Sequence, residues 1–426
     1  MTSNPTRRQV LSITAATGAL AVPLAARADD LPAGGAAPDD EAYWRRVARQ
    51  FDLPTGIVQL ENGNWGAMAR PVLAAYQRRL AQVNTDTSYY SRRGFGADAA
   101  AIRARVAAEL GTAPAEIAFT RGATEALLSL IGGYNRLRPG DQLLYADLDY
   151  DSMQAGIRSV ARRRGLEAIS IALPEPATYQ GVIDAYAAAL AAHPRVRLML
   201  LTHVSHRTGL VLPVREIVAM ARQRGVDVIV DSAHAWGQLD FKVDDLGADF
   251  VGFTCQKWIG APLGVGVIYI RRDRLDAIDV NIGEDAAPRD TTQQRIHTGT
   301  TDIAALLTVN DALDFHQRIG ARAKEARLRH LRDHWAEQAR GLPAIDVLTP
   351  SDPRMTCALT SFRMSGRTSI ADNRALAKQL LDRFGIFTVD RDGPARGACV
   401  RVTPGIFTGI GEIDRLVSAL RILSRS

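Results

Sequence analysis

The chain has 426 residues, of which 46% are apolar and 23% charged, so it is long enough to bury a large core. Its formal net charge of +6 comes from scattered arginines. The sequence contains no Lys/Arg block with interleaved aromatic residues, the pattern that would indicate a nucleic-acid-binding protein. Cys255, Cys357 and Cys399 are too widely spaced for a metal site, and no metal is expected. An oxidising compartment would permit one disulfide among them, but the sequence does not require one.

Residues 1–28 have the pattern of an export signal. The pair Arg7-Arg8 precedes an uncharged stretch from Leu11 to Ala26, and Ala26-Arg27-Ala28 matches an A-x-A cleavage site. The stretch is too short and too rich in Ala, Gly and Thr for a membrane span, so no stable membrane anchor is expected. The paired arginines favour the twin-arginine export machinery; an ordinary secretory signal with two incidental arginines is the alternative. Either route predicts a periplasmic or secreted protein, and cleavage after about Ala28 lowers the formal net charge from +6 to +3.

The mature chain is predicted to begin with a lead-in and arm over residues 29–70, including a helix at 41–51. Residues 71–310 then alternate between helices and apolar strands. Strands are expected at 117–119, 142–146, 167–172, 196–202, 226–230, 250–253 and 264–270, and helices at 99–110, 124–131, 152–164, 181–192 and 213–225. This alternation predicts an α/β fold in which a mostly parallel sheet is covered by helices on both faces.

Residues 311–426 have a different pattern. Two long amphipathic helices are expected, at about 302–340 with a break and at 370–384, the second ended by Gly385. Strands are expected near 358–364 and 398–403. This part is therefore predicted to be a smaller C-terminal α+β domain.

Lysine is rare, since only four of the 52 basic residues are lysine: Lys242, Lys257, Lys324 and Lys378. Lys257 is the one predicted to lie in a buried, glycine-bounded context, just after the strand at 250–253. Asp231 ends another apolar strand 26 residues earlier. In open parallel sheets, ligands bind at the carboxyl ends of the strands. For Lys257 taken alone, the alternative is a surface lysine. For Asp231 taken alone, it is an aspartate that caps a helix.

A lysine and an aspartate in these places can hold the two ends of pyridoxal phosphate (PLP). This cofactor needs a lysine for a Schiff base, a carboxylate for the ring nitrogen, an anion site for the phosphate and a cation for the substrate carboxylate. Burial of Lys257 would lower its pKa and free its amine to react. The start of the helix after Arg121-Gly122 supplies backbone N–H groups for a phosphate.

Six segments of the chain occur in an order that is typical of one family. They are Arg121-Gly122-Ala123-Thr124-Glu125-Ala126, Thr202-His203-Val204-Ser205-His206-Arg207-Thr208-Gly209, Asp231-Ser232-Ala233-His234-Ala235-Trp236-Gly237, Gln256-Lys257-Trp258-Ile259-Gly260-Ala261-Pro262-Leu263-Gly264, the stretch from Arg295 to Thr300, and the stretch from Arg401 to Asp414. Over about residues 55–423 the chain resembles the class V aminotransferase family of fold-type I PLP enzymes. With its twin-arginine signal and its Asp-Ser-Ala-His segment it is most similar to the isopenicillin N epimerase-like members.

The resemblance implies a role for each matching residue. Lys257 would form the Schiff base and act as the catalytic base, Asp231 would pair with the ring nitrogen, and Arg401 would bind the substrate carboxylate. His234 and His206 would contact the cofactor ring or its phenolic oxygen. The expected phosphate contacts are Ala123, Thr124, Thr254 and Gln256. Thr300 would reach the phosphate of a neighbouring subunit, which implies a homodimer. A salt-bridged strand arginine is the alternative for Arg401.

Two positions depart from the family pattern. The residue that stacks on the cofactor ring would be Leu148 or Tyr150. Desulfurases carry a catalytic cysteine where this chain has Ile386, and Cys399 is predicted to be a packed thiol, so desulfurase activity is disfavoured.

The resemblance leaves the reaction open between transamination and epimerisation at the α-carbon of an amino acid or amino-acid-containing compound. A C–S or other β-elimination lyase is an alternative, as is an enzyme that modifies a secreted peptide or siderophore precursor. A PLP-binding protein without turnover is the non-enzymatic alternative, against which Lys257, Asp231 and Arg401 argue together.

Overall fold

The computed structural model describes residues 35–284 and 290–425. The export signal predicted at residues 1–28 lies outside the described residues, as do residues 29–34 of the predicted lead-in. None of the helices in the described part of the chain is long and apolar enough to cross a membrane.

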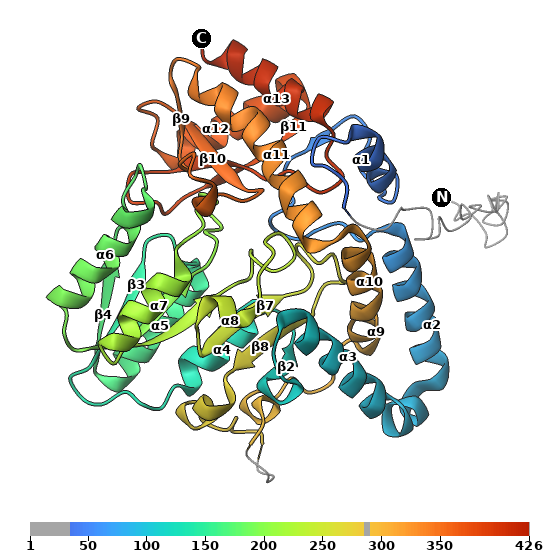
Figure 1. Cartoon of the computed structure of the whole chain (residues 1–426), viewed down its shortest axis with the longest axis vertical. Helices are drawn as coiled ribbons and strands as arrows, with labels where there is room; N and C mark the ends of the chain where they lie inside the picture. The colour runs from blue at the N-terminus through green and yellow to red at the C-terminus, as the bar shows by residue number, and fades with distance from the viewer. Residues whose placement is uncertain (1–34, 285–289, 426) are drawn as a thin grey trace, which may run out of the picture.

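A seven-stranded sheet forms the centre of the larger part of the molecule (Figure 1). Its strands are β2 (Ile117–Thr120), β3 (Gln142–Ala146), β4 (Glu167–Ile171), β5 (Val196–Thr202), β6 (Asp227–Asp231), β7 (Phe250–Thr254) and β8 (Gly266–Ile270). They lie in the order β2-β8-β7-β6-β5-β3-β4, and only β8 runs against its neighbours β2 and β7. The α/β fold with a mostly parallel sheet is therefore confirmed.

Both faces of this sheet are buried, because successive strand residues point to opposite sides. Leu198 and Leu200 of β5 belong to one apolar cluster, whereas Met199 and Leu201 belong to another. Helices cover the two faces: α4 (Ala123–Gly133) and α5 (Asp151–Arg164) on one, and α3 (Phe95–Leu110), α6 (Tyr179–Ala192) and α7 (Val214–Gln223) on the other. The near-continuous apolar strands follow from this two-sided burial.

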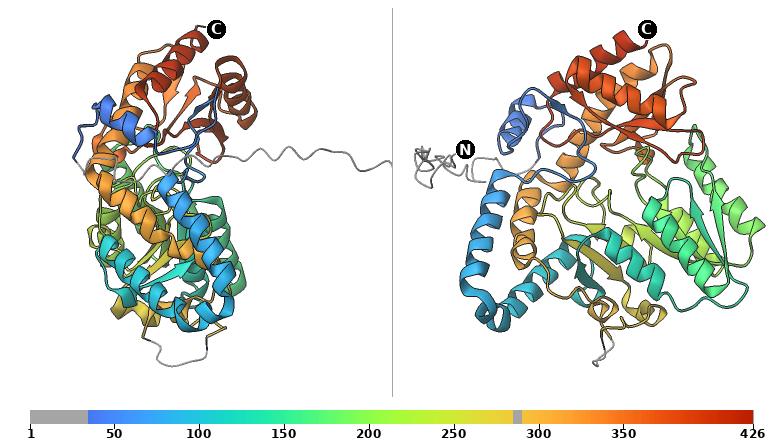
Figure 2. Two further views of the ribbon diagram at one scale, coloured as in Figure 1. Left: turned by 90° about the vertical axis from the view of Figure 1, so that its right-hand side faces the viewer. Right: turned by 180° about the vertical axis from the view of Figure 1, so that it is seen from behind.

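The C-terminal part is built on a four-stranded antiparallel sheet in the order β12-β13-β10-β9. Its strands are β9 (Ile345–Val347), β10 (Thr360–Met364), β12 (Val389–Arg391) and β13 (Cys399–Val402). One face packs Phe362, Val400 and Val402 against the helices α11 (Ala321–Arg340), α12 (Ile370–Phe384) and α13 (Ile410–Leu423). The views in Figure 2 show this orange-to-red part at one end of the molecule and the seven-stranded sheet at the other.

The N-terminal segment joins the C-terminal part. After α1 (Glu41–Ala48), the short strand β1 (Val58–Gln59) pairs in parallel with β11 (Ile386–Phe387). Glu61 then forms a bridge to Thr403, next to β13. The boundaries predicted for the arm and the two domains stay a prediction, but this pairing ties residues near 60 to residues near 400.

Two long helical regions differ from the sequence expectations. No helix is expected from the sequence at α2 (Arg70–Arg93), because its buried residues are Val72 and Ala75 and it lacks a continuous apolar stripe. The region predicted as one broken helix at 302–340 forms α9 (Ile303–Leu307), α10 (Val309–Ile319) and α11. Gly320, with a φ of 87°, separates the last two.

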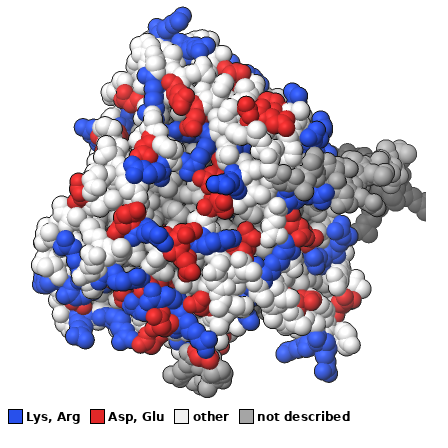
Figure 3. Space-filling model, in the orientation of Figure 1, with Lys and Arg blue, Asp and Glu red and all other residues white. Residues whose placement is uncertain are grey.

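The surface carries many ion pairs. Examples are Arg70 with Asp52 at 2.7 Å and Arg354 with Asp352 at 2.6 Å. Figure 3 shows basic and acidic side chains intermixed over much of one face. Exposed pairs of this kind are screened by water and stabilise a protein little, so burial of apolar residues dominates the stability of the fold.

Candidate functional site

A cavity of about 900 Å³ lies at the edge of the large sheet where the parallel strands β5, β6 and β7 end. The end of each strand contributes a residue to its wall: Thr202, Asp231 and Thr254. Arg391 and Arg401 reach it from the C-terminal sheet, and Gly63 and Asn64 from the N-terminal segment. The site therefore combines three stretches that are far apart in the sequence.

Lys257 follows β7 and places its amine inside the cavity. The amine nitrogen Nζ lies 2.8 Å from Nε2 of His234. Burial lowers the pKa of Lys257 to about 8, although the carboxylate of Asp231 opposes the shift. Burial also holds the pKa of His234 well below its ordinary value, so that its ring is neutral. A lysine in this state has a substantial fraction of free amine near neutral pH and can act as a nucleophile or base.

Asp231 is buried at the end of β6, with 6% of its surface exposed. The hydrogen bond that its carboxylate receives from the described residues comes from the Ala233 backbone N–H, at 2.9 Å. Burial raises the pKa of Asp231. A buried carboxylate with so few partners is costly unless a cationic group binds to it.

The opposite end of the cavity is suited to an anion. Helix α4 begins at Ala123 without a side-chain cap, and Ala123 and Thr124 line the cavity. The first N–H groups of a helix lack partners within it and carry partial positive charge. Thr254 and Gln256 lie beside this helix start, and the Thr254 hydroxyl donates to Gln256 Oε1 at 2.5 Å.

His206 and Tyr150 form another part of the wall. Their rings meet edge to face with centroids 5.0 Å apart. Burial lowers the pKa of His206 to about 3, and its Nδ1 has no hydrogen-bond partner among the described residues. Leu148, the other residue considered for stacking on a cofactor, is packed in the apolar core instead. Tyr150 is therefore the one of the two that faces the cavity.

Arg401 is buried and held from two sides. Its guanidinium donates to the His206 carbonyl at 2.6 Å and to Glu61 Oε1 at 2.5 Å. Its Nε has no partner within the described part of the chain. Arg401 therefore forms a salt bridge, as expected for a purely structural arginine on a strand. It also lines the cavity.

Apart from Thr300, every site residue expected from the sequence lines this one cavity. The set is Ala123, Thr124, His206, Asp231, His234, Thr254, Gln256, Lys257 and Arg401. Thr300 is exposed and lies outside it. The roles given to these residues stay predictions, but the structure brings their side chains together.

The expectation that Lys257 alone among the lysines is buried was wrong. Lys324, on α11, is 6% exposed, and its amine donates to the carbonyl of Trp258. Burial lowers the pKa of Lys324 to about 7. The strongly charged sequence of α11 predicts a solvent-exposed helix. The packing of the C-terminal part nevertheless buries Lys324. Lys324 does not line the cavity, so Lys257 remains the reactive candidate.

The three cysteines are buried with free thiols. Cys399 lies on β13, where burial raises the pKa of its thiol to about 11. Ile386, at the position of the desulfurase cysteine, is fully buried in β11.

Sequence reasoning missed Gly63, Asn64 and Arg391, and also Glu61, which binds Arg401. The segment Leu60-Glu61-Asn62-Gly63-Asn64 carried a signal, because a polar, glycine-containing stretch follows an apolar strand. No feature of the sequence marked Arg391 as a site residue, since arginine is common throughout the chain.

Comparisons with known proteins agree with this geometry. The family model for Aminotransferase class-V matches residues 67–388. Isopenicillin N epimerase from Streptomyces clavuligerus is 30% identical over 399 residues, covering 90% of this chain and 99% of the relative. A probable cysteine desulfurase from Xylella fastidiosa is 25% identical over 419 residues, covering 90% and 96%.

Among solved structures, a C-DES mutant with glycine covalently linked to its PLP cofactor superposes with a TM-score of 0.75. It is 22% identical, with 88% of this chain and 98% of that chain covered. The same enzyme, described as a cystine C–S lyase in complex with cysteine persulfide, gives a TM-score of 0.74 at 25% identity, covering 86% and 98%. The cavity, the order of its motifs and the family match together show that the chain belongs to the class V aminotransferase family.

Proposed function

We propose that the protein is a PLP-dependent enzyme that acts at the α-carbon of an amino acid or amino-acid-containing compound, by epimerisation or transamination. The observation that carries the proposal is the placement of the Lys257 amine in a cavity that Asp231, the start of α4 and Arg401 also line. These groups match the covalent anchor, ring partner, phosphate site and substrate cation that PLP requires.

The residues present fit this cofactor. Asp231 is a buried carboxylate that lacks a cationic partner within hydrogen-bonding distance among the described residues, and a protonated ring nitrogen would supply one. The uncapped start of α4 would receive the phosphate. His206 and His234 each have a buried Nδ1 without a partner in the described chain, so both retain hydrogen-bonding capacity.

The cofactor, when bound, withdraws electron density from the substrate α-carbon and makes its proton removable. Lys257 accepts and returns that proton, because burial lowers its pKa to about 8, so that about half of the amine is neutral at that pH. Arg401, which lines the cavity, would hold the substrate carboxylate. Epimerisation and transamination then differ only in where the proton is returned.

A C–S or other β-elimination lyase is the second candidate, supported by the similarity to the cystine C–S lyase C-DES. Desulfurase chemistry, which the similarity to a probable cysteine desulfurase would suggest, has less support. No cysteine is among the described residues that line the cavity, and the thiol of Cys399 is buried with a raised pKa.

The protein is also proposed to be an exported homodimer. The arginine pair at positions 7 and 8 supports twin-arginine export to the periplasm. In that compartment the alternative substrate is a secreted peptide or siderophore precursor. Exposed apolar side chains support a dimer: Trp65 is 56% and Leu263 58% exposed. In the sequence, each lies close to a segment that lines the cavity. Thr300 is exposed and free to contact a second subunit.

Lys257→Ala should abolish covalent attachment of PLP. The purified wild-type protein should absorb visible light, and borohydride should fix the cofactor on a peptide containing Lys257. The substitution Lys324→Met is the matched control, because it removes the other buried lysine and should leave the label on Lys257. Label on Lys324, or a visible absorbance that survives in Lys257→Ala, would contradict the assignment.

The reactivity of Lys257 should rise with pH and reach half of its plateau at about pH 8, instead of near 10.5, because burial lowers its pKa. Below that pH the amine is protonated and cannot attack. Reductive methylation of the apoprotein with formaldehyde, followed by mass spectrometry of the Lys257 peptide, measures this midpoint. Asp231→Asn should move it lower, since a negative charge that favours the ammonium is lost. An upward movement would show that the two groups do not interact as described.

Wild-type enzyme incubated with an amino-acid panel in deuterated water should place deuterium at the α-carbon of at least one substrate. Inverted substrate without keto acid indicates epimerisation, whereas keto acid indicates transamination. Release of the side chain would instead favour the lyase. Lys257→Ala should slow deuterium incorporation about 10²-fold or more, the usual contribution of a general base; unchanged exchange would remove Lys257 from the chemistry.

Replacing Arg7 and Arg8 together by lysine should keep the protein in the cytoplasm. Cell fractionation with an antibody against the mature chain measures this, and an unchanged periplasmic amount would reject the twin-arginine route. Protein recovered from the periplasm of wild-type cells should sediment at the mass of a dimer.

A further inference from the structure

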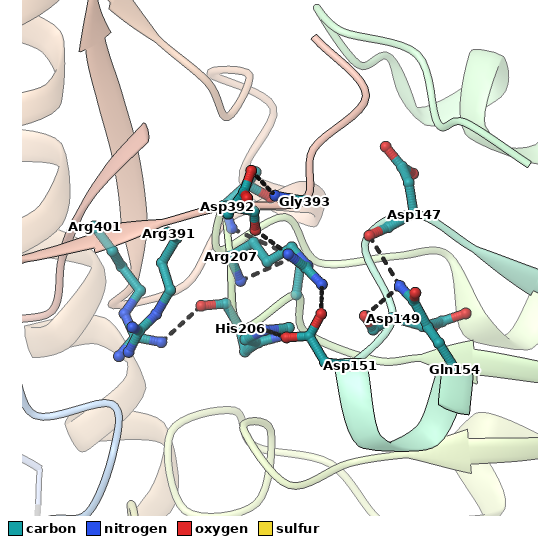
Figure 4. Close-up of polar contacts among 12 residues, drawn as sticks. Asp147, Asp149, Asp151, Gln154, His206, Arg207, Arg391, Asp392, Gly393 and Arg401 are labelled. Carbon is teal, nitrogen blue, oxygen red and sulfur yellow. Dashed lines mark hydrogen bonds and ion pairs between the residues drawn. The ribbon is translucent and has the colours of Figure 1, made fainter. Parts of the chain in front are cut away.

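Arg391 is a second arginine on the same face of the C-terminal sheet as Arg401. In the antiparallel pairing of β12 with β13, Val389 lies opposite Arg401 and Arg391 lies opposite Cys399. Residues 389 and 391 point to the same side of β12, as do residues 399 and 401 of β13. Arg391 and Arg401 are therefore diagonal neighbours, which long side chains can bridge. Both line the cavity, and Figure 4 shows their side chains extending together from adjacent strands.

The two arginines share one carboxylate. Glu61 Oε1 lies 2.5 Å from Arg401 Nη2 but 3.6 Å from Arg391 Nη2. In the described chain, the remaining hydrogen bond of the Arg391 guanidinium goes to the carbonyl of Asp390, at 3.3 Å, and its buried Nε has no partner. Two positive charges thus face one negative charge, and Arg401 takes most of the interaction with Glu61. Arg391 keeps most of its donors for another anion.

The backbone that carries Arg391 is fixed from the large domain. The guanidinium of Arg207 donates both to the carbonyl of Asp392 and to the carboxylate of Asp151 on α5 (Figure 4). Arg207 is 4% exposed, whereas the side chain of Asp151 is 68% exposed, so these bonds are shielded from water mainly at the arginine. They hold the residue that follows Arg391 against the mouth of the cavity, which limits how far Arg391 can move away.

We infer that Arg391 binds a second anionic group on the substrate, at the far end of its side chain, while Arg401 binds the carboxylate at the α-carbon. This inference rests on the proposed function and adds the substrate class: amino acids, or larger compounds that contain one, with an additional carboxylate. A cavity of about 900 Å³ is near the top of the usual range of about 300–1,000 Å³ for ligand pockets, so it admits such a substrate together with a cofactor.

Binding of unreactive acids tests the site without turnover. Calorimetry on the holoenzyme should show that glutarate and adipate bind at least about tenfold more tightly than valerate and hexanoate, because a charged hydrogen-bonded pair contributes that much or more. Arg391→Met should reduce the affinity for the dicarboxylates to that for the monocarboxylates. Arg383→Met, on the exposed side of α12, is the matched control and should leave the preference intact.

Turnover gives a second readout with matched substrates. Aspartate, glutamate and 2-aminoadipate are compared with 2-aminobutyrate, norvaline and norleucine, which have the same chain lengths but lack the second carboxylate. The wild-type enzyme should prefer the best acidic member at least about tenfold in kcat/KM. Arg391→Met should raise KM for that substrate far more than it raises KM for the neutral series, and Arg391→Lys should restore part of the preference.

The outcomes separate this inference from the proposed function. Turnover or α-carbon exchange without a preference for acidic substrates, or with a preference that persists in Arg391→Met, overturns the role of Arg391 alone. An equal loss for acidic and neutral substrates in Arg391→Met also overturns it, because it shows that Arg391 only supports Glu61. Absence of exchange with every amino acid, together with selective binding of dicarboxylates, contradicts the proposed reaction but keeps the anion site.

Discussion

The site depends on a half-buried lysine amine and a buried carboxylate that lie where neighbouring parallel strands end. Asp231 closes β6 and Lys257 follows β7, and these strands pair with Asp231 opposite Gly252. Because helices cover both faces of the sheet, both side chains lie at the edge of the apolar core and line the cavity. Burial lowers the pKa of Lys257 to about 8 and raises that of Asp231, so it shifts each group toward its neutral form. A cofactor with a positive ring nitrogen and an aldehyde would satisfy both at once.

A second buried interaction completes the cavity from the other side. The ion pair between Glu61 and Arg401 joins the N-terminal segment to β13, at 2.5 Å and almost without exposure of the arginine. Removing either partner would leave a buried charge unpaired, which typically costs about 3–5 kcal/mol. The same contact brings Gly63 and Asn64 to the cavity wall and leaves Arg391 beside Arg401. Substrate recognition and the docking of the N-terminal segment are thus coupled through one arginine.

Family membership does not decide the reaction, because the residues shared with relatives serve the step that these enzymes have in common. Lys257, Asp231 and Arg401 would act alike in an epimerase, an aminotransferase or a lyase. Around them, His206, Tyr150 and Arg391 also line the cavity, and Ile386 is expected at the position of the desulfurase cysteine. Selectivity is therefore expected from the residues around the shared lysine, aspartate and arginine.

The sequence by itself determined the parallel sheet and most of the cofactor end of the site. Continuous apolar strands have no other stable arrangement than burial on both faces, and motif residues at strand ends must then meet at one edge. Only the tertiary structure decided the rest. Packing buries Lys324, although this residue lies on a strongly charged helix. It also places Tyr150 rather than Leu148 at the cavity, and it brings Glu61 and Arg391 next to Arg401. These contacts join residues near 60, 150 and 400, and local periodicity carries no information about packing between such distant segments.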